Sequence, residues 1–531
     1  MSAFTQVKAL RPGRNVFDLS YEKKFDFDVG QLIPVYLQEC VPGGTYKIGN
    51  EIVINAQPLN APIYHKLDAT VHYFFVPTRL IFDGWEDFIT GGIDGKDATP
   101  LPRLNSLDDF STYNDVQWCG PFSLYDYFGF PILKPYSTYV YPGYGTYSTD
   151  SDFYFRPLSF PWRIYNLCYN EFYRDETLQS EVDLDQPLVL NRNWSKDYFT
   201  SALPFQQRGT SPALPLSGTA PVLFVSGPNE IPANALYANE VGGITPDWTS
   251  FGVNKSSDPL PVSARGYLGT VSFQDAATFD VSDLRLAFQL QKFMERAARG
   301  GVRYTEFLTS FFGLAPSDAR LQRPEYLGGS KSPILINQVT QTSESGSTPQ
   351  GTLRGKGITA DKNYICKYTT PEFGYIIGIL SVLPMPSYQQ GVERTWLRKV
   401  KSDFYFPMFA HLSEQAVTEE EIYALPGNSK EGNIGNDYVF GYQAPYNELR
   451  MRQNKVCGSL RDTLSYWHMG RIFDSAPSLN SDLITCDAER DHLKRVFAVQ
   501  NVPGLICNFA NIVTGILPIP KYGEPGLIDH S

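Results

Sequence analysis

Alternating apolar and polar positions in the first part of the chain predict β-strands. The pattern is clear in residues 25–41, FDFDVGQLIPVYLQECV, which lead into a Pro-Gly-Gly turn at 42–44. It recurs in residues 65–82, HKLDATVHYFFVPTRLIF, and in residues 332–342. Residues 374–384, GYIIGILSVLP, are apolar almost throughout, which indicates a buried strand. Because strands and helices do not alternate along the chain, a parallel sheet is not expected and a mainly β protein is predicted.

One long helix interrupts this β pattern at residues 283–301, DLRLAFQLQKFMERAARGG. Its apolar residues form a stripe broad enough to bury one side of the helix. Ser282 is expected to cap the first turn, and Gly300 and Gly301 are expected to end the helix. A second, shorter helix is predicted at 305–313, TEFLTSFFG. Periodicity alone favours a long helix that packs on a sheet of its own chain.

Three segments predict loops or connectors rather than regular elements. Residues 94–152 are rich in turn residues, and residues 343–357, SESGSTPQGTLRGKG, predict a flexible connector. Residues 209–269 are rich in Pro and Gly and too long for an ordinary connection, so they form either a disordered linker or a specialised surface loop. The loop is favoured by its large apolar residues, which are Val222, Leu223, Phe224, Trp248 and Phe251.

Composition narrows the class of protein. Aromatic residues make up 14% of the 531 positions and charged residues only 19%, a balance that suits strands and extensive subunit interfaces. No run of about 18 apolar residues is present, so no membrane span is expected. The N-terminal residues 1–14 lack the apolar core of a signal peptide. The seven cysteines show no CxxC pair, which argues against a disulfide framework and for folding in a reducing cytoplasm.

The formal net charge of −11 argues against a protein coated with nucleic acid on every side. Basic residues nevertheless cluster in three stretches without an acid: Lys8, Arg11 and Arg14 at the N-terminus; Arg394, Arg398, Lys399 and Lys401; and Arg450, Arg452, Lys455 and Arg461. Each cluster alone is typical of a solvated face. Together they leave room for one basic surface on an acidic particle.

Motifs that carry catalysis or bind ligands are missing. There is no phosphate-binding glycine loop, no GxSxG elbow and no His or Cys spacing typical of metal sites, and His65 and His72 are expected to be structural. Asp150 and Asp152 suggest a polar turn rather than a calcium loop. Carboxylates and aromatics abound as they do in sugar hydrolases, but no spacing identifies an acid/base pair. The sequence therefore predicts no enzyme, no cofactor and no metal.

Three passages together resemble the major capsid protein of the microviruses, small tailless phages with single-stranded DNA, and in particular its gokushovirus branch. The strongest is DVSDLRLAFQLQKFMERAARGGVRYTEFLTSFFGLAPSDARLQRPEYLGGS at 280–330. The others are NWSKDYFTSALPFQQRG at 193–209 and HKLDATVHYFFVPTRLIFDGWEDFITGG at 65–92. They occur in the family's order, and the resemblance spans essentially the whole chain.

The resemblance implies one jelly-roll capsid domain over residues 1–531, with eight antiparallel strands, long loop insertions and a few short helices. It implies pentamers and a sixty-copy T=1 shell around a circular single-stranded DNA genome, made in the bacterial host cytoplasm and found in the virion. Partners implied are a small basic DNA-packaging protein, a minor spike or pilot protein and a host receptor. A sugar-binding β-sandwich or adhesin, and a carbohydrate-active enzyme, remain alternatives at this point.

In that setting three sets of residues acquire expected roles. Residues 281–313 become a helical insertion at subunit contacts, made by Leu284, Phe288, Leu290, Phe293 and Met294. Residues 209–269 become a variable threefold protrusion that faces the host through Val222, Leu223, Phe224, Trp248 and Phe251. Lys8, Arg11 and Arg14 become the DNA contacts, with the clusters at 394–401 and 450–461 as further contributors.

Overall fold

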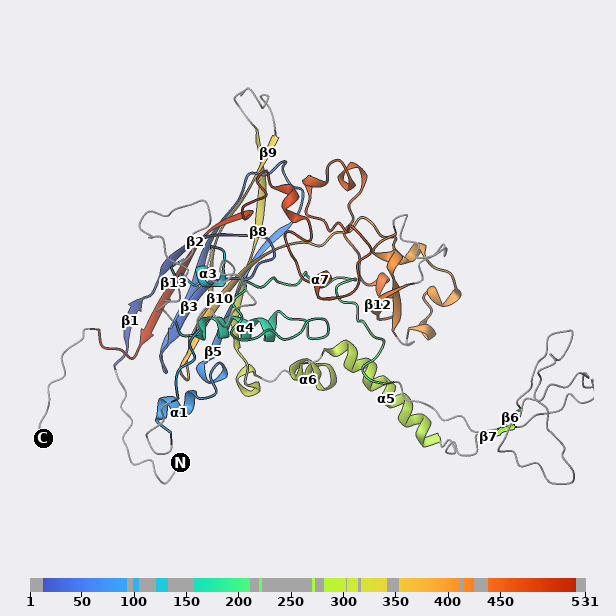
Figure 1. The fold of residues 1–531 in the computed structure, drawn as a ribbon, viewed down its shortest axis with the longest axis horizontal. Coiled ribbons are helices and arrows are strands. Elements are labelled where there is room, and N and C mark those ends of the chain that lie inside the picture. The colour runs from blue at the N-terminus through green and yellow to red at the C-terminus, as the bar shows by residue number, and fades with distance from the viewer. Residues whose placement is uncertain are drawn as a thin grey trace, which may run out of the picture. The chain divides into compact units, whose positions relative to one another are not determined.

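The structure is a computed structural model that describes residues 13–92, 99–104, 121–131, 157–210, 219–221, 270–272, 281–301, 303–313, 317–340, 353–410, 414–424 and 438–521. The chain divides into two compact units, one formed by residues 1–206 and 298–531 and the other by residues 207–297. Figure 1 shows the elements of each unit.

The larger unit is built on a β-sandwich whose strands are all antiparallel to their neighbours. One set pairs in the order β2 (Tyr21–Phe27), β13 (Leu505–Leu517), β4 (Thr45–Ala56) and β9 (Leu353–Thr369). The other pairs in the order β3 (Ile33–Cys40), β10 (Gly374–Pro384), β5 (Leu67–Pro77) and β8 (Glu325–Thr340). The far ends of β8 and β9 pair with each other and join the two sets. This order of strands is that of a jelly roll, which confirms the expected mainly antiparallel β fold.

The expected count of eight strands is not confirmed, because in the described part of the chain the hydrogen-bonded sheet has nine strands. The additional strand is β1 (Asn15–Asp18), which pairs with the last residues of β13, while β2 pairs with its first residues. Leu19 and Ser20 separate β1 from β2. The two strands therefore form one interrupted neighbour of β13 and do not add a further strand to the width of the sheet. The Ser20 side chain binds the backbone of Val513 at this break, which keeps the edge of β13 covered.

The main core lies between the two sets of strands. Strand β13 alternates strictly, with Cys507 and Phe509 buried and Ile506 exposed, so only one of its faces enters the core. Residues of β4 and β5 such as Ile52 and Val71 meet β13 in this layer. The predicted strand pattern of 65–82 is confirmed as β5, and the apolar run at 374–384 is β10.

A second core covers the other face of the β3–β10–β5–β8 set. Helix α4 (Phe160–Phe172), which the sequence analysis did not predict, packs Trp162 and Tyr165 against this sheet, and Figure 1 shows α4 lying across it. Phe74 of β5 and Ile377 of β10 belong to this second core. The sheet is therefore buried on both faces, which explains why β10 is apolar without alternation.

A third, smaller core holds the two-stranded sheet of β11 (Gln415–Thr418) and β12 (Val439–Gln443), with Phe199 among its buried residues. The remaining α-helices of this unit are α1 (Trp85–Thr90), α3 (Leu124–Tyr127), α6 (Tyr304–Phe312) and α7 (Ser481–Ile484). Short 3-10 turns are η1 (Thr78–Leu80), η4 (Asp318–Leu321), η5 (Arg394–Trp396), η6 (Lys401–Asp403), η7 (Pro407–Phe409), η8 (Glu419–Glu421), η9 (Asn447–Leu449), η10 (Gly458–Arg461), η11 (Ser465–Trp467) and η12 (Leu493–Val496).

In the smaller unit, β6 (Thr219–Pro221) pairs antiparallel with β7 (Thr270–Ser272), and helix α5 (Val281–Gly300) begins. Helix α5 confirms the predicted long helix and its end, because Gly301 has a φ of +95°.

Two of the predicted element boundaries were wrong. The helix already begins at Val281, so Ser282 lies inside its first turn instead of capping it. The predicted connector 343–357 also extends too far, since β9 begins at Leu353.

Candidate functional site

Helix α5 exposes large apolar side chains on two sides, with Leu286, Leu290 and Phe293 on one side and Phe288 on the opposite side. Phe288, Leu290 and Phe293 are 63%, 45% and 47% exposed, and Leu286 of the same helix is 67% exposed. Of the five residues predicted to make subunit contacts, these three are therefore accessible. Leu284 and Met294 are only partly exposed. At Met294 the helix contacts another segment of the smaller unit. The backbone carbonyl of Met294 accepts a hydrogen bond from the backbone N–H of Arg208 (3.5 Å).

The helix that follows is held to the β-sandwich unit by buried charge. The guanidinium of Arg303 lies 3.0 Å from the Glu176 carboxylate and 3.5 Å from that of Glu306. It also donates to the backbone carbonyl of Asn170 at the end of α4 (2.7 Å). Because Arg303 is only 15% exposed, this network fixes the start of α6 against α4. The predicted helix at 305–313 is confirmed as α6, which ends at Gly313 in the left-handed conformation.

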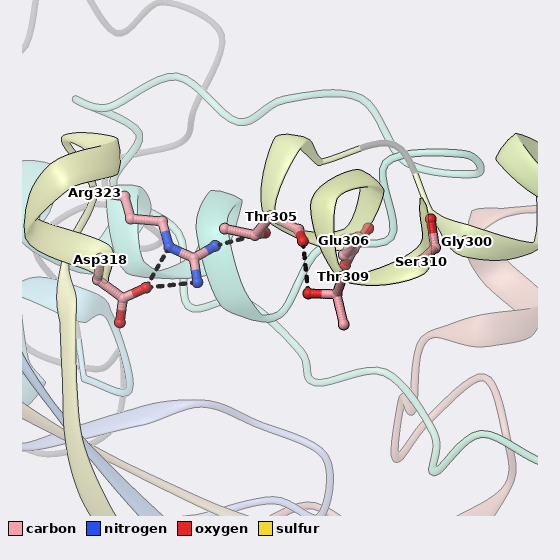
Figure 2. Close-up of a pocket in the computed structure, with 7 residues that line it drawn as sticks. All are labelled: Gly300, Thr305, Glu306, Thr309, Ser310, Asp318 and Arg323. Carbon is pink, nitrogen blue, oxygen red and sulfur yellow. Dashed lines mark hydrogen bonds and ion pairs between the residues drawn. The ribbon is translucent and has the colours of Figure 1, made fainter. Parts of the chain in front are cut away.

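A cavity of about 460 Å³ lies beside α6, as Figure 2 shows. It is lined by Gly300, Thr305, Glu306, Thr309, Ser310, Asp318 and Arg323. Its charged wall is the pair of Arg323 and Asp318, with Arg323 Nε donating to the carboxylate at 2.7 Å. The hydroxyls of Thr309 and Ser310 donate to backbone carbonyls of α6 itself.

A second cavity of about 430 Å³ shares Arg323 with the first and is walled mainly by aromatic rings. His72 Nδ1 lies 2.8 Å from the hydroxyl of Tyr173 in this wall, so His72 is structural, as predicted. Burial, together with the nearby Arg192 guanidinium, lowers the pKa of His72 to about 4. Burial also lowers the pKa of Arg192, whose Nη1 donates to Ser381 Oγ at 2.9 Å. The imidazole is therefore neutral near pH 7.

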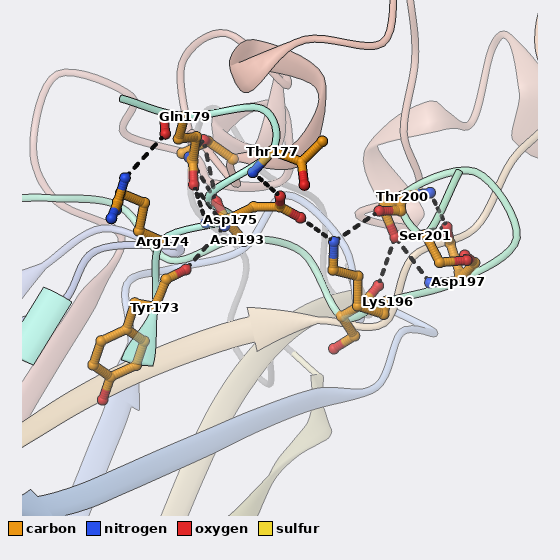
Figure 3. Close-up of polar contacts among 12 residues, drawn as sticks. Tyr173, Arg174, Asp175, Thr177, Gln179, Asn193, Lys196, Asp197, Thr200 and Ser201 are labelled. Carbon is orange, nitrogen blue, oxygen red and sulfur yellow. Dashed lines mark hydrogen bonds and ion pairs between the residues drawn. The ribbon is translucent and has the colours of Figure 1, made fainter. Parts of the chain in front are cut away.

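The motif at 193–209 has a structural role, which Figure 3 shows in its polar contacts. The Asn193 side-chain amide donates to the backbone carbonyl of Tyr173 (2.9 Å), and Lys196 binds the Asp175 carboxylate (2.5 Å). The Asp197 carboxylate accepts from the backbone N–H of Thr200 (2.8 Å), which closes a tight turn. These bonds tie the segment that follows α4 to the segment that leads out of the sandwich unit.

The two internal basic clusters meet in the folded chain, although about fifty residues separate them. Arg398 of the first lies 3.6 Å from Glu448, directly before the second. Lys455 of the second lies 2.7 Å from Glu393, directly before the first. Arg394 pairs with the buried Glu421 at 3.0 Å, so it also braces the fold. The sequence shows no acid inside either cluster, but tertiary structure supplies several.

The remaining predicted residues lie mostly outside the described part of the chain. Lys8 and Arg11 lie outside the described residues. So do the five residues expected in the protrusion, which are Val222, Leu223, Phe224, Trp248 and Phe251. Arg14 is described and is exposed directly before β1.

Sequence reasoning also missed one exposed group of rings. Trp396, Phe404, Tyr405 and Phe406 are each 47–76% exposed. The signal was present in RTWLRKVKSDFYF, where rings follow cations closely, but only the cations were noted.

The described residues hold no set of three or more His, Cys, Asp or Glu side chains arranged to bind a metal ion. Within the same part of the chain, no helix has the length and apolarity needed to cross a bilayer. The fold and these surfaces together define a jelly-roll protein with exposed apolar and aromatic residues.

Comparison with known proteins identifies the family. The model of the family described as capsid protein (F protein) matches residues 5–527. The chain is 32% identical to the capsid protein VP1 of Chlamydia phage 1, with 99% of this chain and 97% of that protein covered. It is 30% identical to VP1 of Bdellovibrio phage phiMH2K (98% and 97% covered) and 29% identical to VP1 of Spiroplasma virus 4 (99% and 97%).

The chain therefore belongs to the capsid protein (F protein) family. It is a structural protein of the virion rather than an enzyme, and it acts as part of an oligomeric shell. This result favours the shell protein over the sugar-binding sandwich and the carbohydrate-active enzyme that the sequence left open.

The depressed pKa of His72 predicts acid sensitivity of the fold. Because the folded-state pKa of about 4 lies below the ordinary value of about 6.5, protons bind more readily to the unfolded chain. The contribution of His72 to the free energy of unfolding is therefore complete above a pH of about 6.5 and is lost as the pH falls toward about 4. Urea unfolding of the unassembled chain at a series of pH values should show this loss.

The matched variant is His72→Gln, which can still bind the Tyr173 hydroxyl but does not titrate. We expect a flatter dependence of unfolding free energy on pH in this variant, with a residual slope from His65, whose pKa burial also lowers to about 4. Identical slopes for the two proteins would show that His72 does not titrate as described.

Proposed function

We propose that sixty copies of this chain close a T=1 icosahedral shell, through pentamers, around a circular single-stranded DNA genome. The observation that carries this proposal is the family match, which covers residues 5–527. The exposed Leu286, Leu290 and Phe293 of α5 support it, because they lie on one side of the helix and an exposed apolar face marks a contact site. Folding and assembly take place in the cytoplasm of a bacterial host.

The helical insertion 281–313 makes subunit contacts in this proposal. Phe288, Leu290 and Phe293 lie on α5, and Arg303 locks the following helix α6 to the sandwich unit. In a closed shell, each symmetry axis requires a contact surface on the subunit that is either self-complementary or complementary to a different surface of the neighbouring copy. Leu284 and Met294, which are partly exposed, complete the residues proposed for this contact.

Substitution of α5 should separate folding from assembly. Phe288→Asp and Leu290→Asp change side chains that are exposed in the single chain, so the unfolding free energy should shift by less than about 0.5 kcal/mol. In a shell contact the same carboxylate would be buried without a partner, at a cost of several kcal/mol per contact. We expect folded chains that form few particles, as measured by circular dichroism and by sedimentation.

The matched control is Gln289→Asp, which adds the same charge at an exposed polar position between them. It should assemble normally. Full particle yield from both Phe288→Asp and Leu290→Asp would remove α5 from the subunit contacts.

Genome contact is assigned to Lys8, Arg11 and Arg14, with the clusters at 394–401 and 450–461 as further contributors. Phosphate neutralisation needs clustered cations and no base-specific code, since one shell must accept the whole genome. Arg14 is exposed, which suits this role. A small basic packaging protein would supply much of the positive charge that this acidic chain lacks.

Removal of the three N-terminal cations tests this assignment. The triple variant Lys8→Gln, Arg11→Gln, Arg14→Gln should form particles that hold less DNA or release it at lower salt, because each lost phosphate contact weakens the electrostatic attraction. The measurement is the ratio of DNA to protein in purified particles over a salt series. The control variant Lys8→Arg, Arg11→Lys, Arg14→Lys keeps all three positive charges and should hold the wild-type amount of DNA. Unchanged DNA content in the Gln variant would contradict the assignment.

Residues 209–269 are proposed to form a threefold protrusion that meets the host receptor, with a minor spike or pilot protein assisting delivery. The proposal is supported by the resemblance and by the sequence, whose Val222, Leu223, Phe224, Trp248 and Phe251 could pack against symmetry-related copies. If these apolar residues were exposed without packing against other copies, they would promote aggregation.

Deletion of this segment separates attachment from assembly. When residues 212–262 are replaced by a short Gly/Ser linker, particles should still form, because the core of the jelly roll is built from described residues on either side of this segment. Binding of the particles to host cells should fall sharply. Undiminished infectivity would exclude a receptor role, and loss of particles would make the segment an assembly element instead.

A further inference from the structure

The second of the two cavities, with a volume of about 430 Å³, lies where the pair β5–β8 meets the end of α4. Its walls include the rings of Phe74, Phe172, Tyr173 and Tyr326. The Phe74 ring centre lies 4.6 Å from that of Phe172 and 5.5 Å from that of Tyr326. Sites for small molecules have volumes of roughly 300–1,000 Å³ and mainly apolar walls. We call this space the aromatic cavity.

A β-bulge between β5 and β8 builds one wall of the aromatic cavity. Gly328, with a φ of +138°, lies opposite Tyr73. The next residue of β5, Phe74, lies opposite Tyr326, so Leu327 is the extra residue. Leu327 packs on the main core, and Tyr326 is left in the cavity wall. In regular pairing the alternation of side chains would put Leu327 in that wall, so the bulge is what brings the tyrosine there.

Arg192 brings a positive charge to the aromatic cavity. Its Nη1 donates to Ser381 Oγ (2.9 Å), and its guanidinium lies over the Tyr173 ring at 6.0 Å. Both partners are neutral, and among the described residues no carboxylate lies within ion-pair distance of Arg192. The other arginine of the wall, Arg323, is paired with Asp318 (2.7 Å). The wall therefore carries one net positive charge in a place where a cation without a counter-charge is costly.

His72 adds a hydrogen-bond donor to the same wall. Its Nδ1 lies 2.8 Å from the Tyr173 hydroxyl, and its ring centre lies 5.9 Å from that of Tyr326. When the Tyr173 hydroxyl donates to Nδ1, the neutral imidazole carries its proton on Nε2. That N–H and the guanidinium of Arg192 then give the cavity donors from two side chains. Donors and a positive charge surrounded by rings are complementary to an anion that carries a ring of its own.

We propose that the aromatic cavity binds a small organic carboxylate whose remaining part is a flat aromatic ring system. A guanidinium binds a carboxylate through strong, charge-assisted hydrogen bonds, and aromatic walls pack on a flat ring in stacked or edge-on geometry. A neutral apolar ligand would leave Arg192 without a counter-charge, and a cation would be repelled by it. The proposal concerns a ligand site within the single chain and does not depend on the shell proposal.

An acidic side chain of a second copy is the competing occupant of the aromatic cavity. Such a side chain would supply the carboxylate for Arg192. It carries no ring, however, so it would leave the aromatic walls without a matching partner. A small aromatic carboxylate satisfies both parts of the cavity, and contact with a second copy is an outcome of the test.

The first test titrates the full, unassembled chain with 2-naphthoate in a calorimeter. The Kd should be about 1 mM or lower, which is the weakest binding expected for an organic ligand of this size in a formed site. The neutral 2-naphthamide has the same shape and should bind at least about 10-fold more weakly, because it lacks the charge-assisted hydrogen bonds. Acetate has the charge without the ring and should show no measurable binding at the same concentrations. This comparison of three probes needs no variant.

Variants then assign the binding to this cavity. Arg192→Met should raise the Kd for 2-naphthoate about 10- to 100-fold, and Arg192→Lys, which keeps the charge, should raise it less. Tyr326→Leu removes one ring of the wall and should raise the Kd about 2- to 10-fold. The control Arg490→Met removes an arginine exposed elsewhere on the larger unit and should leave the Kd unchanged. Circular dichroism of each variant checks that it is folded.

Photolabelling of the wild-type chain locates the ligand directly. Irradiation with 6-azido-2-naphthoate should place the adduct in peptides that contain residues 72–74, 172–173 or 326, and excess 2-naphthoate should suppress it. Equal affinity for 2-naphthoate and 2-naphthamide, or an adduct elsewhere in the chain, would overturn the proposal. If Arg192→Met binds 2-naphthoate as the wild type does but forms no particles, the cavity receives a neighbouring copy instead, and the proposal is again overturned.

Discussion

The sheet β3–β10–β5–β8 is buried on both faces, and the rest of the larger unit is arranged to satisfy that constraint. On one face Ile376 and Leu380 of β10 belong to the core shared with the opposite set of strands. On the other, Ile377 and Ile379 belong to the core covered by α4. At about 25 cal/mol for each Å² of apolar surface removed from water, these two layers are the main source of stability in the unit.

The same constraint explains the glycine in the middle of β10. An added Cβ at Gly378 would lie 2.8 Å from the Tyr73 ring and 3.0 Å from Tyr36, both on neighbouring strands. The pairing of β10 with β3 also shifts register between Gly378 and Ile379. A position without a side chain lets the large rings of β5 and β3 occupy the space over the strand.

Because the cores are completed within one chain, the exposed apolar residues that remain are available for contacts with other molecules. Two groups stand out among the described residues: the large apolar residues of α5, and the rings Trp396, Phe404, Tyr405 and Phe406. Beside the rings, Arg394 is held by the buried Glu421 of the same unit. Rigid support of this kind suits a protein whose work is repeated, identical contact.

The sequence alone determined the class of fold, the long helix and the absence of recognisable catalytic motifs, because these depend on local periodicity and local spacing. The alternation in β5, the apolar run of β10 and the glycine end of α5 were all readable in this way. The resemblance of whole passages, a comparison rather than a physical deduction, pointed to the capsid family.

Tertiary structure decided what depends on distant partners. Helix α4 was missed because its buried face carries Trp162, Tyr165 and Cys168, a mixture that follows the sheet beneath it rather than a simple apolar stripe. Sequence also could not show that Arg398 meets Glu448 or that Lys455 meets Glu393, since charges 50 and 62 residues apart are joined only by the fold. Nor could periodicity reveal which side of α5 stays exposed, because an amphipathic pattern specifies that a face will be covered and not which molecule will cover it.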